Sequence, residues 1–188
     1  MARPRSDIKP SAIIAGATRV IASQGLSAST AAIAKESGVS NGSLFTYFET
    51  KADLLNKLYV ELKTEMAEAT LEGLTDDRDL REQALRVWSQ WLNWATSYPE
   101  KRRTLALLNV SDDITAESQQ TASRAMTEVR KLLNRVSENG PMRDTPLEFR
   151  LSLMNGVAEA TIQFMIHDPA DADTHCTAGF EAFWRMTV

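Results

Sequence analysis

The stretch STAAIAKESGVSNGSLFTYFETK, residues 29–51, predicts two short helices that cross at a tight turn. Ser29 and Thr30 offer hydroxyls to the unpaired N–H groups at a helix start, and Ser40 does the same for the second helix. Gly38 favours the left-handed conformation that ends a helix. The apolar residues that would pack around the turn are Ile33, Ala34, Val39, Leu44 and Phe48. This pattern is typical of a helix-turn-helix.

The start of the second predicted helix carries short polar side chains or none, which suits close approach to the edges of DNA bases. Thr50 and Asp53 would form a capping box that opens a third helix and places Lys51 at an N-terminus where a phosphate is favoured. We expect base contacts from Asn41, Ser43, Phe45 and Thr46, and phosphate contacts from Thr30, Tyr47 and Lys51. The full set of candidate DNA-binding residues is Arg3, Arg5, Thr30, Ser40, Asn41, Gly42, Ser43, Phe45, Thr46, Tyr47 and Lys51.

Two simpler interpretations stand beside this one. A pair of short helices around a glycine is also a common packing device. Arg3 and Arg5 form a basic arm of the kind that reaches phosphates or the minor groove, but a solvated tail has the same composition.

The run LFTYFETKADLL, residues 44–55, resembles the TetR family of bacterial transcriptional repressors, in which a YF-x-x-K-x-x-L run closes the helix-turn-helix. The segments MARPRSDIK, GSLFTYFETKADLLNKLY, DPADAD and GFEAFWR are similar to RamR-like, drug-responsive members. The resemblance implies a homodimer that represses transcription until a small molecule binds. Phe45 departs from the family, which often has an aromatic hydroxyl there, although its ring can still pack against a thymine methyl.

Charge is distributed unevenly along the 188 residues, whose formal net charge is −4. Residues 1–51 hold six basic and three acidic side chains, a net charge of +3, which leaves −7 for the remainder. A basic headpiece on an acidic body orients itself toward a polyanion. No window is apolar enough for a membrane helix and the N-terminus lacks the apolar run of a signal peptide, so we expect a cytoplasmic protein without a membrane partner.

Apolar residues at helical spacing, with proline and glycine between the segments, predict an all-α fold. The expected helices include one that Gly25 ends, a long one from Lys51 to about Gly73, one from Pro99, one from Asp112 or Asp113 to Ser137, and one that Thr145 and Pro146 open. A last helix is expected from about Asp171. We predict a three-helix DNA-binding domain in residues 1–50 and a ligand-binding and dimerisation domain in residues 51–188.

Large aromatic residues gather on one face of the helix that follows Asp79. The proposed ligand-binding residues are Tyr59, Trp88, Trp91, Trp94 and Met154. Such residues also fill ordinary cores, and the prediction of a pocket rests mainly on the family resemblance.

The last two helices are apolar on more than one side, which predicts a four-helix interface with a second copy through Leu153, Val157, Phe164, Phe180, Phe183 and Trp184. The alternative is a buried hairpin in a monomer.

Other chemistry has little support in the sequence. His167, Asp168, Asp171, His175 and Cys176 are metal-ligand types, but a helix break at Pro169 separates the histidines, so no metal is predicted. We find no nucleophile elbow, phosphate-binding glycine loop or paired-histidine metal motif, and predict neither an enzyme nor a cofactor. The sequence therefore predicts a repressor that binds a pseudo-palindromic operator and is released by a lipophilic or cationic inducer. A helical ligand-binding protein without an operator is the alternative.

Overall fold

Ten α-helices and one short 3-10 helix make up the computed structural model, which describes residues 10–75 and 79–188. No β-strand occurs in these residues, and the predicted all-α fold is confirmed. Contacts divide the chain into two compact units, Met1–Lys63 with Pro99–Ala122 and Thr64–Tyr98 with Ser123–Val188. The domain boundary predicted after residue 50 does not coincide with a boundary between these units, and the division into a DNA-binding and a ligand-binding domain stays a prediction. No helix of the described residues is long and apolar enough to cross a membrane.

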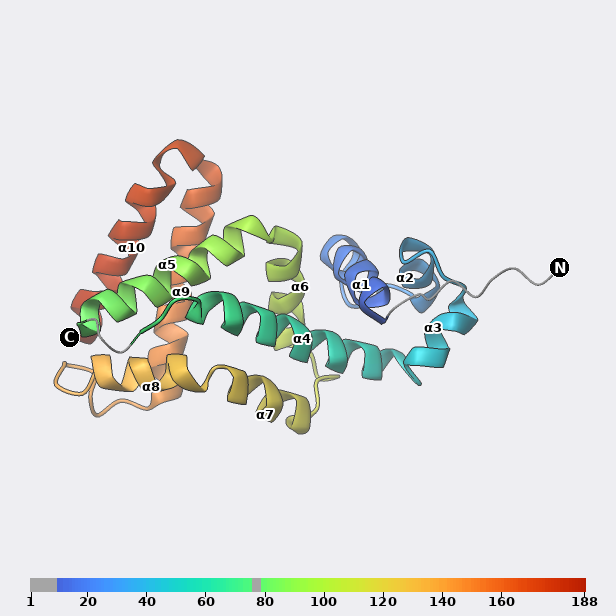
Figure 1. Cartoon of the computed structure of the whole chain (residues 1–188), viewed down its shortest axis with the longest axis horizontal. Helices are drawn as coiled ribbons and strands as arrows, with labels where there is room; N and C mark the ends of the chain where they lie inside the picture. Colours follow the sequence, from blue (N-terminus) through green and yellow to red (C-terminus); the bar gives the residue numbers. More distant parts are fainter. Residues whose placement is uncertain (1–9, 76–78) are drawn as a thin grey trace. The chain divides into compact units, whose positions relative to one another are not determined.

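The first unit begins with three helices, α1 (Pro10–Gln24), α2 (Thr30–Glu36) and α3 (Asn41–Tyr47), which the long helix α4 (Lys51–Leu71) follows (Figure 1). Helix α1 ends before Gly25, whose φ of 78° lies in the left-handed region, as predicted. Its buried side includes Ile13, Ala17 and Ile21, each with no exposed surface. The α1 face therefore supplies much of the core beneath α2, on which α3 packs in turn.

Helix α6 (Pro99–Asn109) belongs to the same unit and packs on α1. The Thr104 hydroxyl, with no exposed surface, donates to the Thr18 carbonyl at 2.9 Å. Arg103 Nη1 donates to the Ala22 carbonyl at 3.4 Å. Two polar contacts thus fix α6 against one face of α1.

The loop after α6 is held to α4 by a single amide. Asn56 Nδ2 donates to the Asp113 carbonyl at 2.8 Å, and Asn56 Oδ1 accepts from the Thr115 backbone N–H at 2.9 Å. Because the amide uses both its donor and its acceptor, the loop is fixed in register along α4. Helix α7 (Ala116–Ala125) begins directly after this contact.

The second unit contains α5 (Leu80–Ser97), α8 (Thr127–Val136), α9 (Leu147–His167) and α10 (Ala172–Thr187), with a 3-10 turn at Pro169–Asp171. Helices α9 and α10 lie side by side (Figure 1). Trp88 of α5 is stacked on Phe183 of α10, with ring centroids 5.7 Å apart, and its indole N–H donates to the Cys176 carbonyl at 3.0 Å. Phe180 has no exposed surface, so α5, α9 and α10 share one core.

Two predicted helix boundaries were wrong. The helix expected from Asp112 or Asp113 to Ser137 begins at Ala116 and is interrupted at Met126, which leaves the helical conformation with φ −90° and ψ 10°. At the start of α9, the Thr145 hydroxyl donates backwards to the Met142 carbonyl at 2.7 Å, so Pro146 is the capping residue and no side chain caps this helix. Local sequence signals indicated both starts only approximately.

Replacing Thr104 with valine tests the contact between α6 and α1. We expect Thr104→Val to lower the free energy of unfolding by about 1–2 kcal/mol, because a buried hydroxyl loses its hydrogen bond to Thr18. Urea denaturation followed by circular dichroism measures the change. Thr121→Val is the matched control, since the Thr121 hydroxyl bonds to Glu117 of its own helix at an exposed site. An equal loss in both variants would contradict the assignment.

Candidate nucleic-acid interface

Helix α3 is held at both ends by hydrogen bonds, of which the sequence predicted the one at Ser40. The Ser40 hydroxyl accepts from the Ser43 backbone N–H at 3.0 Å, and the N–H of Phe48 donates to the Leu44 carbonyl at 3.1 Å. The preceding turn places Gly38 at φ 70°, in the left-handed region. These bonds fix the direction in which a helix of only seven residues presents its outer face.

The outer face of α3 is exposed while its inner face is buried. Leu44 has no exposed surface and Phe48 has 7%, whereas Phe45 and Tyr47 expose 42% and 46% of their surfaces. The other exposed residues of the helix are Asn41, Gly42 and Thr46, and Ser43 is partly exposed. The residues predicted to touch bases therefore share an accessible surface, although their role in binding DNA stays a prediction.

Gly42 is a glycine that the fold does not require. Its φ is not in the left-handed region, and the atom nearest to a Cβ built there would be Ser40 Oγ, at 3.9 Å. Alanine favours the helical conformation more than glycine does. The protein itself therefore leaves room for a side chain at Gly42, and the surface of α3 at this point is bare backbone.

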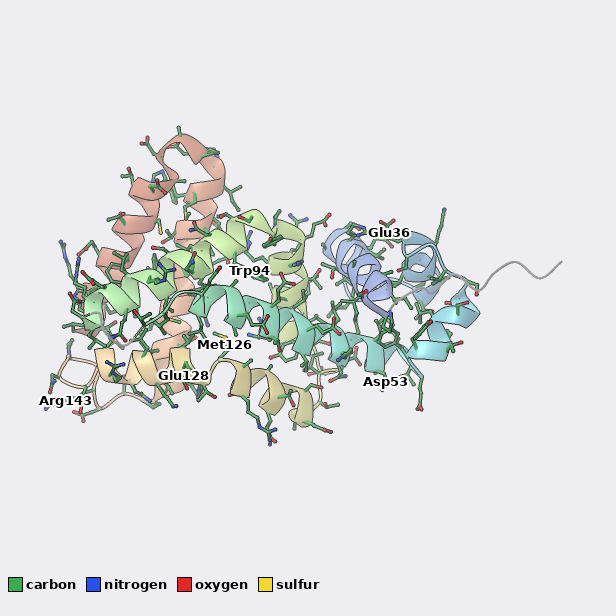
Figure 2. The ribbon with its side chains drawn as sticks, in the orientation of Figure 1. Glu36, Asp53, Trp94, Met126, Glu128 and Arg143 are labelled. Atoms are coloured by element: carbon green, nitrogen blue, oxygen red, sulfur yellow. The ribbon has the colours of Figure 1, made fainter. Side chains whose placement is uncertain are left out.

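Lys51 has a partner that the sequence did not indicate. Its ammonium group donates to the Leu26 carbonyl at 2.5 Å, which ties the start of α4 to the loop between α1 and α2. Thr50 and Asp53 form the predicted capping box, with reciprocal hydrogen bonds of 2.9 and 3.0 Å. Two ammonium N–H groups of Lys51 remain for a phosphate after the bond to Leu26. Figure 2 labels Asp53 near the start of α4.

Two further contacts that position α2 have no signal in the sequence. Arg19 of α1 pairs with Glu36 at 2.6 Å, and both side chains are more than 40% exposed, so the pair aligns the helices more than it stabilises them. A Cβ on Gly16 would lie 2.1 Å from Ser37 Oγ, so α1 and the end of α2 approach too closely for alanine. Both contacts join residues far apart in the sequence, which leaves no local signal of either partner.

The remaining predicted DNA contacts lie at the edges of this surface. Thr30 is the first residue of α2 and is partly exposed, next to Ser29, whose hydroxyl accepts from the Ala32 backbone N–H at 3.1 Å. Arg3 and Arg5 lie outside the described residues. The basic arm therefore stays a prediction from the sequence alone.

The predicted ligand residues fall in different units. Tyr59 belongs to the first unit, whereas Trp88, Trp91, Trp94 and Met154 belong to the second. Trp88, 2% exposed, is part of the core, and Trp91 meets it edge to face at 6.2 Å. Trp94, labelled on α5 in Figure 2, donates its indole N–H to Glu65 Oε1 at 3.2 Å. Ligand binding by this group stays a prediction.

The predicted dimerisation residues divide into buried and accessible sets. Phe180 and Phe183 are 0% and 5% exposed within one chain, so the sequence could not distinguish their core role from an interface role. Phe164 is 60% exposed, and Leu153, Val157 and Trp184 are partly exposed. An apolar groove on α9 and α10 is lined by Gly156, Val157, Ala160, Thr161, Phe164, His175, Ala178, Gly179 and Ala182.

Close packing of α9 and α10 explains one glycine in this groove. A Cβ on Gly179 would lie 2.2 Å from Thr161 Oγ1, so α10 can approach α9 at this point only without a side chain. His175 Nε2 lies 3.3 Å from Asp168 Oδ2, and the ring centroids of His175 and Phe164 are 5.7 Å apart. Among residues 10–75 and 79–188, no group of three or more metal-ligand side chains is placed to hold a metal ion.

Comparison with known proteins gives this geometry a family context. Residues 13–58 match the family described as bacterial regulatory proteins, tetR family. A putative TetR-family regulator from Shewanella sp. PV-4 is 28% identical with a TM-score of 0.83, over 95% of this chain and 98% of that one. A TetR-family regulator from Marinobacter aquaeolei VT8 is 23% identical with a TM-score of 0.82, over 97% of each chain.

A third solved structure, the regulator FadR from Bacillus subtilis in complex with stearoyl-CoA, is 19% identical with a TM-score of 0.70, over 93% of this chain and 97% of that one. At such identity the likeness concerns the fold alone. Together with the match in residues 13–58, these similarities show that the chain has a TetR-family N-terminal domain and the fold of TetR-family transcription regulators.

Proposed function

We propose that this protein is a ligand-responsive transcriptional repressor that binds a pseudo-palindromic operator as a homodimer. The observation that carries the proposal is the exposed face of α3, fixed by caps at both ends within a TetR-family domain. Such a helix fits the major groove of B-DNA. Because its target would be operator DNA, we expect the protein to act in the cytoplasm as a regulator and not as an enzyme.

The accessible apolar groove on α9 and α10 supports the homodimer. Small residues along it allow the helices of a second copy to approach, and Val157 and Phe164 provide apolar surface. A two-fold axis would pair the same face of both copies and set the two α3 helices apart by about 34–36 Å or a multiple of it. The RamR-like subtype and a multidrug response stay predictions from the sequence resemblance.

Release by a small molecule requires a link between the ligand and the headpiece. Helix α4 runs from the first unit into the second and would be one such link, and the contacts of Thr104 and Asn56 add residues 99–122 as a second segment attached to the headpiece. A ligand that binds one state more tightly would shift the equilibrium, typically by ~1–3 kcal/mol. We infer that α6 moves together with α1.

The test of this function is binding to DNA that flanks the gene of the protein, measured by fluorescence anisotropy at two salt concentrations. We expect tight, salt-dependent binding to one segment and weak binding to unrelated DNA of equal length. Weak and equal binding to every segment would favour a helical ligand-binding protein without an operator.

Gly42→Ala tests whether α3 approaches DNA closely. We expect the variant to be as stable as the wild type or more stable, because the protein leaves room for the methyl group and alanine favours the helix. Operator affinity should nevertheless fall by about tenfold or more if the methyl group prevents the close approach, a loss similar to the ~1–3 kcal/mol that one mismatched base pair typically costs. Thermal unfolding and anisotropy provide the two measurements. An unchanged operator affinity of Gly42→Ala would show that α3 does not approach the bases closely at Gly42.

Lys51→Ala and Thr46→Ala separate phosphate contacts from base contacts. Lys51→Ala should weaken binding to every DNA sequence and reduce the slope of log K against log salt by about 0.9 for each phosphate that the variant no longer neutralises. Thr46→Ala should change the preference among operator variants and leave the slope intact. If Lys51→Ala lowers stability by removing the bond to Leu26 and leaves the slope unchanged, then Lys51 only positions the loop.

Val157→Glu tests the dimer. In a paired groove the variant would bury an unpaired carboxylate, which costs about 3 kcal/mol or more, so we expect a monomer in sedimentation velocity experiments and loss of operator binding. Asn155→Glu, on an exposed position of α9 outside the groove, should leave the dimer intact. Identical sedimentation of both variants would exclude this face as the interface.

A further inference from the structure

One side of α4 is buried but contains a lysine. Tyr59, Lys63, Met66 and Thr70 follow one another at the spacing that places residues on a single helix face. Tyr59, Met66 and Thr70 are 8%, 7% and 2% exposed, and Lys63 is partly buried. Lys63 is the one charged residue among the four. A charge in a buried stripe usually has a partner of opposite sign.

The partner of Lys63 is an aromatic ring. Its ammonium nitrogen lies 5.8 Å from the ring centroid of Tyr59, one helical turn earlier. In the part of the chain that the structure describes, no carboxylate lies within ion-pair distance of Lys63, and the Tyr59 hydroxyl forms no hydrogen bond. The ammonium and the phenol are thus two hydrogen-bond donors on one face that the protein leaves unused.

Lys57, on the same helix, shows the ordinary arrangement. It is exposed and pairs with Glu61 across one turn at 3.5 Å. The positions three and four residues from Lys63 are Tyr59, Val60, Met66 and Ala67, none of which is acidic. The sequence around Lys63 therefore offers no counter-ion along α4 itself.

Burial affects both donors in the way expected for groups removed from water. Desolvation lowers the pKa of Lys63 and raises the pKa of Tyr59, and no carboxylate of the described residues offsets the change at Lys63. The charged lysine is consequently less favourable than it would be in water, so an anion beside it would stabilise the charged form. A cationic molecule would add repulsion instead.

We propose that Lys63 and Tyr59 bind the head group of an acidic amphiphile, a molecule with an apolar body and a carboxylate or phosphate head, and that this molecule is the inducer. The ammonium group supplies a charge-assisted hydrogen bond and the Tyr59 hydroxyl a second one. Only the role of this molecule as an inducer rests on the proposed function; the binding site itself does not. The sequence predicted a lipophilic or cationic ligand, whereas this site favours an anionic one.

Three probes with the same ten-carbon chain separate the possible head groups: decanoate, decyl phosphate and decyltrimethylammonium. Each is titrated into the full-length protein, below the concentration at which it forms micelles, and binding is measured by isothermal titration calorimetry. We expect at least one of the two anions to bind and the cation to bind at least tenfold more weakly. Comparison of the anions identifies a carboxylate or a phosphate ligand.

Substitutions then locate the head group. Lys63→Met should weaken binding of the anionic probe at least tenfold, Lys63→Arg should retain most of it, and Tyr59→Phe should weaken it by a smaller factor. Lys57→Met, which removes an exposed lysine from the same helix, is the matched control and should bind as the wild type does. Thermal unfolding verifies the fold, since removal of a desolvated charge should leave Lys63→Met at least as stable.

Two kinds of result would overturn the site. Equal binding of the cation and the anions, or binding of neither anion, contradicts the anionic class, and an unchanged affinity in Lys63→Met contradicts the location. Operator binding is measured separately on the same variants, without any probe. If the protein binds the anion specifically but does not recognise an operator, the proposed repressor function is contradicted. The proposed anion site at Lys63 and Tyr59 is then still supported.

Discussion

Two helices of seven residues each are too short to be stable alone in water, and the surface that we propose to bind DNA depends on how the rest of its unit holds them. Ser29 and Ser40 cap their first turns, Ile33 and Leu44 are buried, and α2 packs on both α1 and α3. The close approach at Gly16 and the bond from Lys51 to Leu26 fix the two remaining sides. An exposed recognition face is the result of these restraints together.

The same unit extends beyond the headpiece. Helix α6 and the loop before α7 are attached to α1 and α4 by Thr104 and Asn56, so residues 99–122 share a compact unit with α1, α2 and α3. The chain passes between the two units at Lys63, at Tyr98 and at Ala122. In our proposal, a ligand that changes the body would act on the headpiece through these connections, two of which lie within continuous helices.

Local signals explain which parts of the fold could be predicted from the sequence. The caps at Ser29, Ser40 and Asp79 and the capping box at Thr50 join residues three positions apart, so their chemistry is visible in the sequence itself. The bond from Thr104 to Thr18 joins residues 86 positions apart and has no local signature. The break at Met126 was missed because the apolar spacing continues across it.

Apolar spacing also shows that a side chain is covered but not what covers it, so Phe180 and Phe183 of the core were grouped with Phe164 of the surface. A ligand-binding role for Lys63 could not be predicted from the sequence, because one lysine in a charged helix has no distinctive pattern until its burial is known.

In the proposed complex, a pair of α3 helices reads two half-sites on one face of DNA. Hydroxyl-radical footprinting on the segment that binds most tightly tests it directly. We predict two protected tracts on one face of the duplex, centred about 34–36 Å apart or at a multiple of that distance, and related by the symmetry of the sequence. A single tract, or protection spread evenly along the DNA, would contradict binding by a pair of α3 helices.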